Sequence, residues 1–350
     1  VLIDLDSGEV LFDRAGGRRR PIASTTKIMT ALLVLESATP FDEVIASDNA
    51  VLEEGAELGL GEGERIPVRE LLYALMLQSA NDAAVALAEH VGGSVDAFIE
   101  EMNNRTREMG LTDTRFASPN GLDDSGHSTA RDLAAITVEA FRSPTFAETV
   151  GAKFRTIPAQ EGPARRIQNR NALLWLYPDA LGVKTGYTAA AGFCLVAAAE
   201  RDGFRLATVV LGAPGEPFSD AAALLNYGFQ AYERRQVVGL GDRLDPIRVA
   251  GRLVTVEAGD VLRVLVRRGD SVVEEMRPSR TLSLPLARGE RVGELVVSVS
   301  GQELGVVPVV TAEAVPATPA VRQVWWRRVW DAITSFLGRT FGPVLEDRSL

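Results

Sequence analysis

The sequence has few residues that can form disulfides or bind transition metals. Among its 350 residues one is cysteine, Cys194, and two are histidine, His90 and His127. No disulfide can therefore form within the chain, and no cluster of cysteines and histidines is available for a structural zinc ion. We expect Cys194 to be a small buried hydrophobic residue and both histidines to have structural roles.

Long apolar runs are absent as well. No segment approaches the roughly 20 consecutive apolar residues that a membrane-spanning helix needs. The first residues, from Val1 to Leu5, already have the pattern of an apolar strand, and neither an initiator Met nor a signal peptide precedes them. We therefore expect that upstream residues, a signal peptide among them, are missing from this sequence.

Lysine is scarce, and acidic residues outnumber basic ones. The formal net charge is −10, which argues against a general nucleic-acid binder, so no nucleic-acid partner is expected. Of the 37 basic residues 34 are Arg, and the remaining three are Lys27, Lys153 and Lys184. Because a guanidinium stays protonated in proteins, an arginine could not serve as a base at position 27, whereas a lysine can. We interpret Lys153 as a surface residue.

One stretch near the N-terminus combines a hydroxyl with an amine. Ser24 is predicted at the N-cap or first turn of a largely apolar helix over residues 24–37, and Lys27 lies three residues later on the same face. A buried lysine with a lowered pKa can take the proton of a serine and make it a nucleophile. On its own, S-x-x-K is more often a capping serine followed by a surface lysine.

Two further polar stretches could complete a site. Ser79 and Asn81 lie in a predicted break between helices, where their side chains can point into a cleft. The segment from residue 181 to 187 has the pattern of a strand, with Lys184 and Gly186 on one side and Thr185 on the other. A glycine beside Lys and Thr allows the backbone of a peptide substrate to approach closely.

The chain is predicted to be α+β in its first two thirds. Hairpins are expected over residues 1–13 and over 193–199 with 205–211, and residues 41–66 are expected to be loops with short strands. Apolar periodicity predicts helices over residues 24–37, 67–78, 83–90, 95–109, 128–141 and 217–235. From about residue 150 the pattern becomes extended. We place a first domain over residues 1–235, a small all-β domain over 236–312 and a linker over 313–320.

The C-terminal segment, residues 321–343, is predicted to be an amphipathic helix. Its apolar face is rich in tryptophan and its polar face is rich in arginine, although the protein as a whole is acidic. This combination is typical of helices that lie in a membrane interface, so we expect a peripheral membrane anchor. The alternative is a helix that docks onto the β-domain.

The three polar stretches together resemble a known family. The order S-x-x-K, S-x-N, K-T-G is the motif set of penicillin-binding proteins and serine β-lactamases. The surroundings, PIASTTK at 21–27, SANDAA at 79–84, KTGYT at 184–188 and AGFCLV at 191–196, resemble the low-molecular-mass penicillin-binding proteins, which are serine-type D-alanyl-D-alanine carboxypeptidases. The resemblance implies a helical cluster on an antiparallel sheet, then a β-domain and a membrane anchor.

The resemblance also implies an activity and an extracytoplasmic location. The substrate would be a peptidoglycan stem peptide ending in D-Ala-D-Ala, the inhibitors would be β-lactams, and no metal or organic cofactor is implied. Ser24 would attack the carbonyl between the two D-alanines, and Lys27 would accept its proton. Ser79 would relay a proton to the leaving nitrogen.

The remaining motif residues would bind the substrate. Asn81 would hold a substrate amide, while Lys184 would supply positive charge near Lys27 and Thr185 would bind the terminal carboxylate. The backbone N–H groups of Ser24 and Tyr187, which flanks Gly186, would form the oxyanion hole. Relatives often have His where Tyr187 stands.

Other functions remain open at this point. A β-lactamase would need a glutamate to activate water; Glu100 and Asn103 fit a loose E-x-x-N pattern, but on a periodic amphipathic helix. The same residues could cleave cross-links as a D,D-endopeptidase. In a third alternative the protein binds the cell wall without hydrolysing it.

Overall fold

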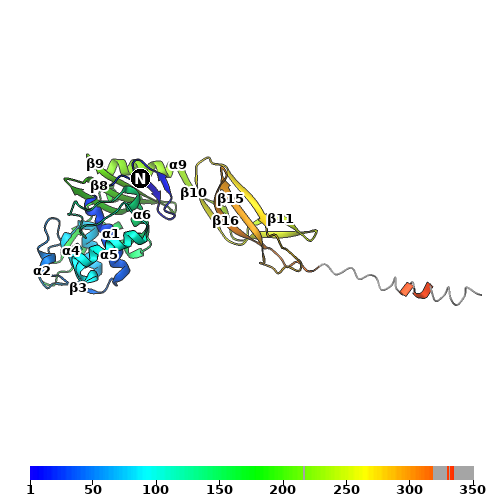
Figure 1. Ribbon diagram of the computed structural model, residues 1–350, viewed down its shortest axis with the longest axis horizontal. Coiled ribbons are helices and arrows are strands. Elements are labelled where there is room, and N and C mark those ends of the chain that lie inside the picture. The colour runs from blue at the N-terminus through cyan, green and yellow to red at the C-terminus, as the bar shows by residue number, and fades with distance from the viewer. Residues whose placement is uncertain (216, 318–328, 331, 335–350) are drawn as a thin grey trace, which may run out of the picture. The chain divides into compact units, whose positions relative to one another are not determined.

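The computed structural model describes residues 1–215, 217–317, 329–330 and 332–334 (Figure 1). The chain divides into two compact units at Glu233 and Arg234. Each unit has its own apolar core. The candidate site belongs entirely to the first unit.

The first unit is built on a five-stranded antiparallel sheet. Its strand order is β2-β1-β9-β8-β7, so the N-terminal hairpin joins strands from the end of the unit. The hairpin of β8 and β9 confirms the predicted one, and its long apolar runs account for the burial of the strand centres. The strands are β1 (Leu2–Asp4), β2 (Val10–Phe12), β7 (Ala180–Thr188), β8 (Gly192–Arg201) and β9 (Phe204–Ala213).

Helices lie on both sides of this sheet (Figure 1). Helix α9 approaches β1 and β9 so closely that a methyl group at Gly228 would meet the side chains of Leu2 and Leu206. On the other side lies a helical cluster around α1, whose residues are all buried from Lys27 to Val34. The longer helices are α1 (Lys27–Ser37), α3 (Val68–Tyr73), α4 (Asn81–Gly92), α5 (Val95–Glu108), α6 (Ala130–Ala140), α7 (Pro144–Gly151) and α9 (Phe218–Ala231).

Short elements connect the cluster. Two small hairpins, β3 (Glu43–Ile45) with β4 (Arg65–Pro67) and β5 (Phe154–Ile157) with β6 (Arg165–Gln168), flank it. The one-turn helices α2 (Asp48–Val51) and α8 (Leu173–Leu176), and the eight-residue α7, were not predicted from apolar periodicity. A 3-10 turn η1 (Ala23–Thr26) precedes α1, and a π-helical turn η2 (Ala74–Gln78) continues α3.

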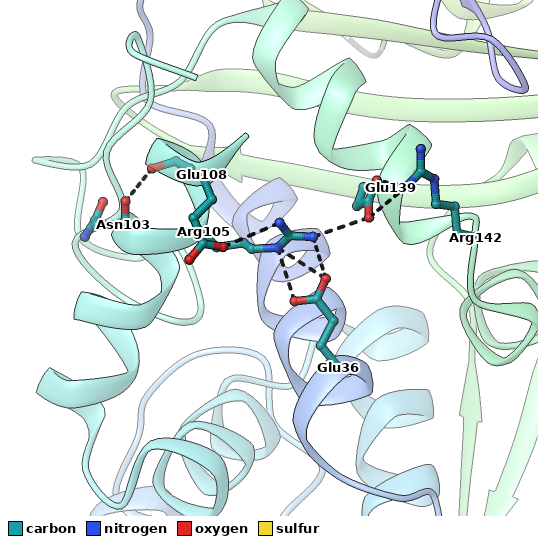
Figure 2. A network of polar contacts seen from close by, with 7 residues as sticks. Glu36, Asn103, Arg105, Glu108, Glu139 and Arg142 are labelled. Carbon is teal, nitrogen blue, oxygen red and sulfur yellow. Dashed lines mark hydrogen bonds and ion pairs between the residues drawn. The ribbon is translucent and has the colours of Figure 1, made fainter. Parts of the chain in front are cut away.

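Arg105 ties three helices of the cluster together. Figure 2 shows its guanidinium between Glu36 of α1 and Glu139 of α6, at 2.8 Å and 3.3 Å. Only 22% of the Arg105 side chain is exposed, whereas Arg142, the other partner of Glu139, is 73% exposed. Half-buried bidentate contacts hold their geometry better than exposed ion pairs.

The second unit is formed by β-strands over its described residues up to 317, as its valine-rich segments predict. A five-stranded sheet has the order β11-β12-β16-β15-β14, and β10 pairs separately with β13. Alternate residues of β12, among them Val254 and Val256, are buried in its core. The strands are β10 (Tyr232–Val238), β11 (Arg243–Val249), β12 (Arg252–Ala258), β13 (Leu262–Arg267), β14 (Val272–Pro278), β15 (Arg291–Val299) and β16 (Gln302–Thr311).

The predicted amphipathic helix at residues 321–343 lies almost entirely outside the described residues. Residues 329–330 and 332–334 are described and are helical. Within the part of the chain that the structure describes, no helix has the length and apolar character needed to cross a bilayer.

Candidate active site

Ser24 lies in a tight turn rather than inside a regular helix. It is the second residue of η1, and α1 begins three residues later at Lys27. The side chain of Thr25 donates to the carbonyl of Ile22 at 2.6 Å, which fixes the turn. The predicted first-turn position is therefore correct in placement, but the turn is 3-10. This conformation is common at helix starts.

Lys27 contacts Ser24 and two carbonyl oxygens. Its Nζ lies 3.1 Å from Ser24 Oγ, 2.8 Å from Asn81 Oδ1 and 2.7 Å from the backbone oxygen of Asn120. Both carbonyl oxygens only accept hydrogen bonds. A neutral amine would donate its two hydrogens to them, which leaves the nitrogen lone pair directed at the Ser24 hydroxyl. This arrangement suits a general base.

The surroundings of Lys27 favour that neutral form. Its side chain is fully buried, and burial, followed by the positive charges of Lys184 and Arg170, places its pKa well below the usual range of a lysine. The carboxylates of Glu53 and Asp82 act in the opposite direction. The neutral amine that a general base requires is therefore more readily formed at Lys27 than at an exposed lysine.

Ser79 and Asn81 sit where two helices break, as predicted. The turn η2 ends at Ser79, which has the left-handed conformation with φ of 65°, and α4 starts at Asn81. Such a backbone conformation is uncommon for a residue other than glycine and turns the chain sharply. Asn81 Nδ2 donates to the carbonyl of Glu54 at 2.7 Å, which directs Oδ1 at Lys27.

Strand β7 lies next to the turn that carries Ser24. An ideal Cβ on Gly186 would lie 3.1 Å from the backbone nitrogens of Ser24 and Thr25, so the strand and the turn are in close contact. Lys184 is buried and donates to the carbonyl of Thr185 at 2.9 Å. Burial, together with the charge of Arg170, lowers the pKa of Lys184 to about 7. Tyr187 is exposed and packs against Phe193, with ring centroids 4.7 Å apart and the ring planes tilted by 41°.

A cleft of about 560 Å³ brings most of the predicted residues together. Its lining includes Ser24, Ser79, Asn81, Thr185, Gly186 and Tyr187. Lys27 and Lys184 are buried and are not among the lining residues. Six of the eight predicted residues therefore share one cleft, and the other two lie behind it.

Three residues of the site were missed from the sequence. Arg170 lines the cleft, Asn120 supplies a backbone oxygen to Lys27, and Glu53 accepts a hydrogen bond from Asn120 Nδ2 at 2.7 Å. The only signal in the sequence was the SPNG turn at residues 118–121, which indicates a loop but not the residue that this loop contacts. By contrast Asn103, weighed as a β-lactamase element, uses its side chain to hold Phe116, and neither it nor Glu100 lines the cleft.

Comparison with known proteins gives a consistent result. A family model described as D-alanyl-D-alanine carboxypeptidase, peptidase S11, matches residues 1–215. The D-alanyl-D-alanine carboxypeptidase DacF of Bacillus subtilis is 31% identical over 327 residues, covering 89% of this chain and 84% of that protein. DacC of Escherichia coli, which has the same enzyme name, is 31% identical over 98% of this chain and 88% of its own length.

Solved structures extend the likeness to the fold. Penicillin binding protein 5 from Haemophilus influenzae superposes with a TM-score of 0.71 at 29% identity, covering 90% of this chain and 96% of that one. Penicillin binding protein 6B from Escherichia coli gives 0.70 at 28% identity, with 88% and 93% covered. The chain belongs to the peptidase S11 family, the serine-type D-alanyl-D-alanine carboxypeptidases.

Proposed function

We propose that Ser24 is the nucleophile and Lys27 the general base with which this carboxypeptidase removes the terminal D-alanine of peptidoglycan stem peptides. The observation that carries these roles is the contact set of Lys27. Two of its three partners can only accept hydrogen bonds, and the third is the Ser24 hydroxyl. Burial favours the neutral amine that such a base requires.

The first step forms a bond from Ser24 Oγ to the carbonyl carbon between the two D-alanines, as Lys27 takes the hydroxyl proton. The oxyanion of the tetrahedral intermediate would accept from the backbone N–H groups of Ser24 and Tyr187. The contact between Gly186 and the Ser24 turn supports this pairing. Each such donor is typically worth about 3 to 4 kcal/mol of transition-state stabilisation.

The second half of the reaction releases D-alanine. The bond from carbon to nitrogen breaks, and the proton held by Lys27 passes through Ser79 to the leaving nitrogen. The carboxylate of the departing residue would lie near Thr185, in the positive field of Lys184 and Arg170. Water then hydrolyses the ester on Ser24, and Asn81 holds a substrate amide during both steps.

A direct test combines a fluorescent penicillin with a peptide that ends in D-Ala-D-Ala. Wild-type protein should be labelled at Ser24 and should release D-alanine, and Ser24→Ala should do neither. Slow loss of the label argues against a β-lactamase, and cleavage of a cross-linked dimer would reveal endopeptidase activity. A folded wild-type protein that neither labels nor releases D-alanine would exclude the proposed reaction and favour a binding protein.

We further propose that the enzyme acts outside the cytoplasm, held at the membrane surface by residues 321–343. The arginine- and tryptophan-rich composition of this segment supports the proposal. Deletion of residues 320–350 should move the protein from sedimented anionic vesicles to the supernatant without lowering D-alanine release. Unchanged sedimentation would contradict the anchor.

A further inference from the structure

Two consecutive residues hold both oxygen acceptors of Lys27. Glu54 accepts from Asn81 Nδ2 through its backbone carbonyl, and Glu53 accepts from Asn120 Nδ2 through its carboxylate, each at 2.7 Å. Asn81 and Asn120 in turn present the oxygens that face Lys27. The loop between α2 and β4, which contains both glutamates, is therefore connected to the base on two sides.

Asn120 is buried, and hydrogen bonds fix both its side chain and the peptide group before it. It is 2% exposed, and its Oδ1 accepts from the backbone N–H of Leu122 at 3.0 Å. The carbonyl before it, on Pro119, accepts from Thr30 of α1 at 2.5 Å. Of the contacts that the Asn120 side chain makes, the bond to Glu53 is the one that reaches a distant segment, 67 residues away in sequence. Glu53, which lies outside the turn that contains Asn120, thus restrains rotation of the peptide group whose carbonyl faces Lys27.

We propose that Glu53 is a positioning residue for the general base: by holding the side-chain amide of Asn120, it keeps the Asn120 carbonyl on the Lys27 amine. The proposal rests on the role of Lys27 proposed above. If the carbonyl turned away, the neutral amine would have one acceptor for two hydrogens, and its lone pair would no longer be fixed on Ser24.

Glu53 also contributes charge. The charged groups that act on Lys27 are Lys184 and Arg170, which lower its pKa, and Glu53 and Asp82, which raise it. Asp82 is already occupied by the backbone N–H groups of residues 58–60, at 2.9 to 3.1 Å. The Glu53 carboxylate therefore counteracts the two neighbouring cations and raises the pH at which Lys27 loses its proton.

Two substitutions separate the two contributions. In Glu53→Gln the side-chain oxygen can still accept from Asn120, but the charge is lost. In Glu53→Ala both are lost. The matched control is Glu62→Gln, which makes the same charge change at an exposed position of the same loop, away from the cleft lining.

The scarcity of lysine allows Lys27 to be observed directly. Protein labelled with ε-¹³C lysine has only three signals, and Lys153→Arg and Lys184→Arg assign two of them. In Glu53→Gln the titration of Lys27 and the acid limb of the acylation rate should both move to lower pH, with a plateau rate near that of wild type. Glu53→Ala should acylate roughly 10- to 100-fold more slowly at its optimum. Glu62→Gln should match wild type in both measurements.

The outcomes distinguish this inference from the function on which it rests. If the Lys27 titration is the same in wild type and Glu53→Gln, and Glu53→Ala acylates at the wild-type rate, Glu53 has no positioning role, although Ser24-dependent acylation still stands. If wild-type protein is not acylated at all, the proposed function fails instead. If Glu53→Ala does not fold, Glu53→Asp keeps the charge but shortens the side chain by one methylene, and its acylation rate tests the positioning role instead.

Discussion

Gly186 has space for a hydrogen atom and little more. Its α-carbon faces the turn that carries Ser24, and the Ile22 carbonyl lies 3.2 Å from where a Cβ would stand. The backbone of β7 can therefore approach the Ser24 turn closely enough for the proposed oxyanion hole, which uses N–H groups of both segments. Any side chain at this position would separate them.

Gly186→Ala should therefore slow acylation more than it lowers stability. We expect the acylation rate with fluorescent penicillin to fall roughly 10- to 100-fold, because the turn must move by a few tenths of an ångström. The unfolding free energy should fall by about 1 to 3 kcal/mol. Gly17→Ala is the control, because a Cβ there meets nothing within 4 Å. Equal acylation by Gly186→Ala and wild type would show that the contact is unimportant.

At the scale of elements, the Arg105 contacts join α1, which carries Lys27, to α5 and α6. Arg105→Ala would remove the cation that Glu36 and Glu139 share and would leave Glu139 with the exposed Arg142 alone. We expect a loss of about 1 to 2 kcal/mol in the unfolding free energy, measured by urea denaturation.

Arg142→Ala is the matched control for this prediction. It removes a second arginine from the same Glu139, but at a position that is 73% exposed. Its effect should stay within about 0.5 kcal/mol. Equal losses in the two variants would mean that Arg105 contributes no more than a surface ion pair.

The sequence predicted elements with strong apolar periodicity better than those without it. The hairpin of β8 and β9 and the helices α5 and α6 were expected close to their observed bounds. The helix predicted over residues 217–235 ends earlier, at Ala231, and its last four residues begin strand β10. The one-turn α2 and α8 were not expected, because four residues are too few to show a period. The π-helical end of α3, which delivers Ser79, has no sequence signal of its own.

The same limit applies to the site. Ser24, Lys27 and Asn81 were found because their chemistry lies in side chains at recognisable spacings. Asn120 contributes to Lys27 through its backbone carbonyl, which any residue possesses. Glu53 contacts the site through the side chain of Asn120, 67 residues away in sequence, and neither its residue type nor its spacing marks that contact.

At the scale of the whole molecule, burying an amine couples stability to pH. In the folded protein the pKa of Lys184 is about 7, whereas in the unfolded chain it is near 10.4. Between these values the unfolded chain binds the proton that the folded chain has released. Rising pH therefore favours the folded state in this window, and below pH 7 the full cost of a buried ammonium remains.

A comparison of wild type with Lys184→Met isolates this contribution. The unfolding free energy of wild type minus that of Lys184→Met should increase by a few kcal/mol as the pH rises from about 7 to about 10. Denaturant titrations at intervals of one pH unit would measure it. A difference that does not change with pH would mean that Lys184 has the same proton affinity in both states.

Because almost all basic residues are arginine, the surface presents few lysine amines. Lys27 and Lys184 are buried, so among the three lysines only Lys153 presents its amine to solvent, 5.9 Å from the ring of Trp175. Among the lysines, a succinimidyl ester should therefore modify Lys153 selectively, besides any free N-terminal amine. A dye attached at Lys153 would report on Trp175 by quenching.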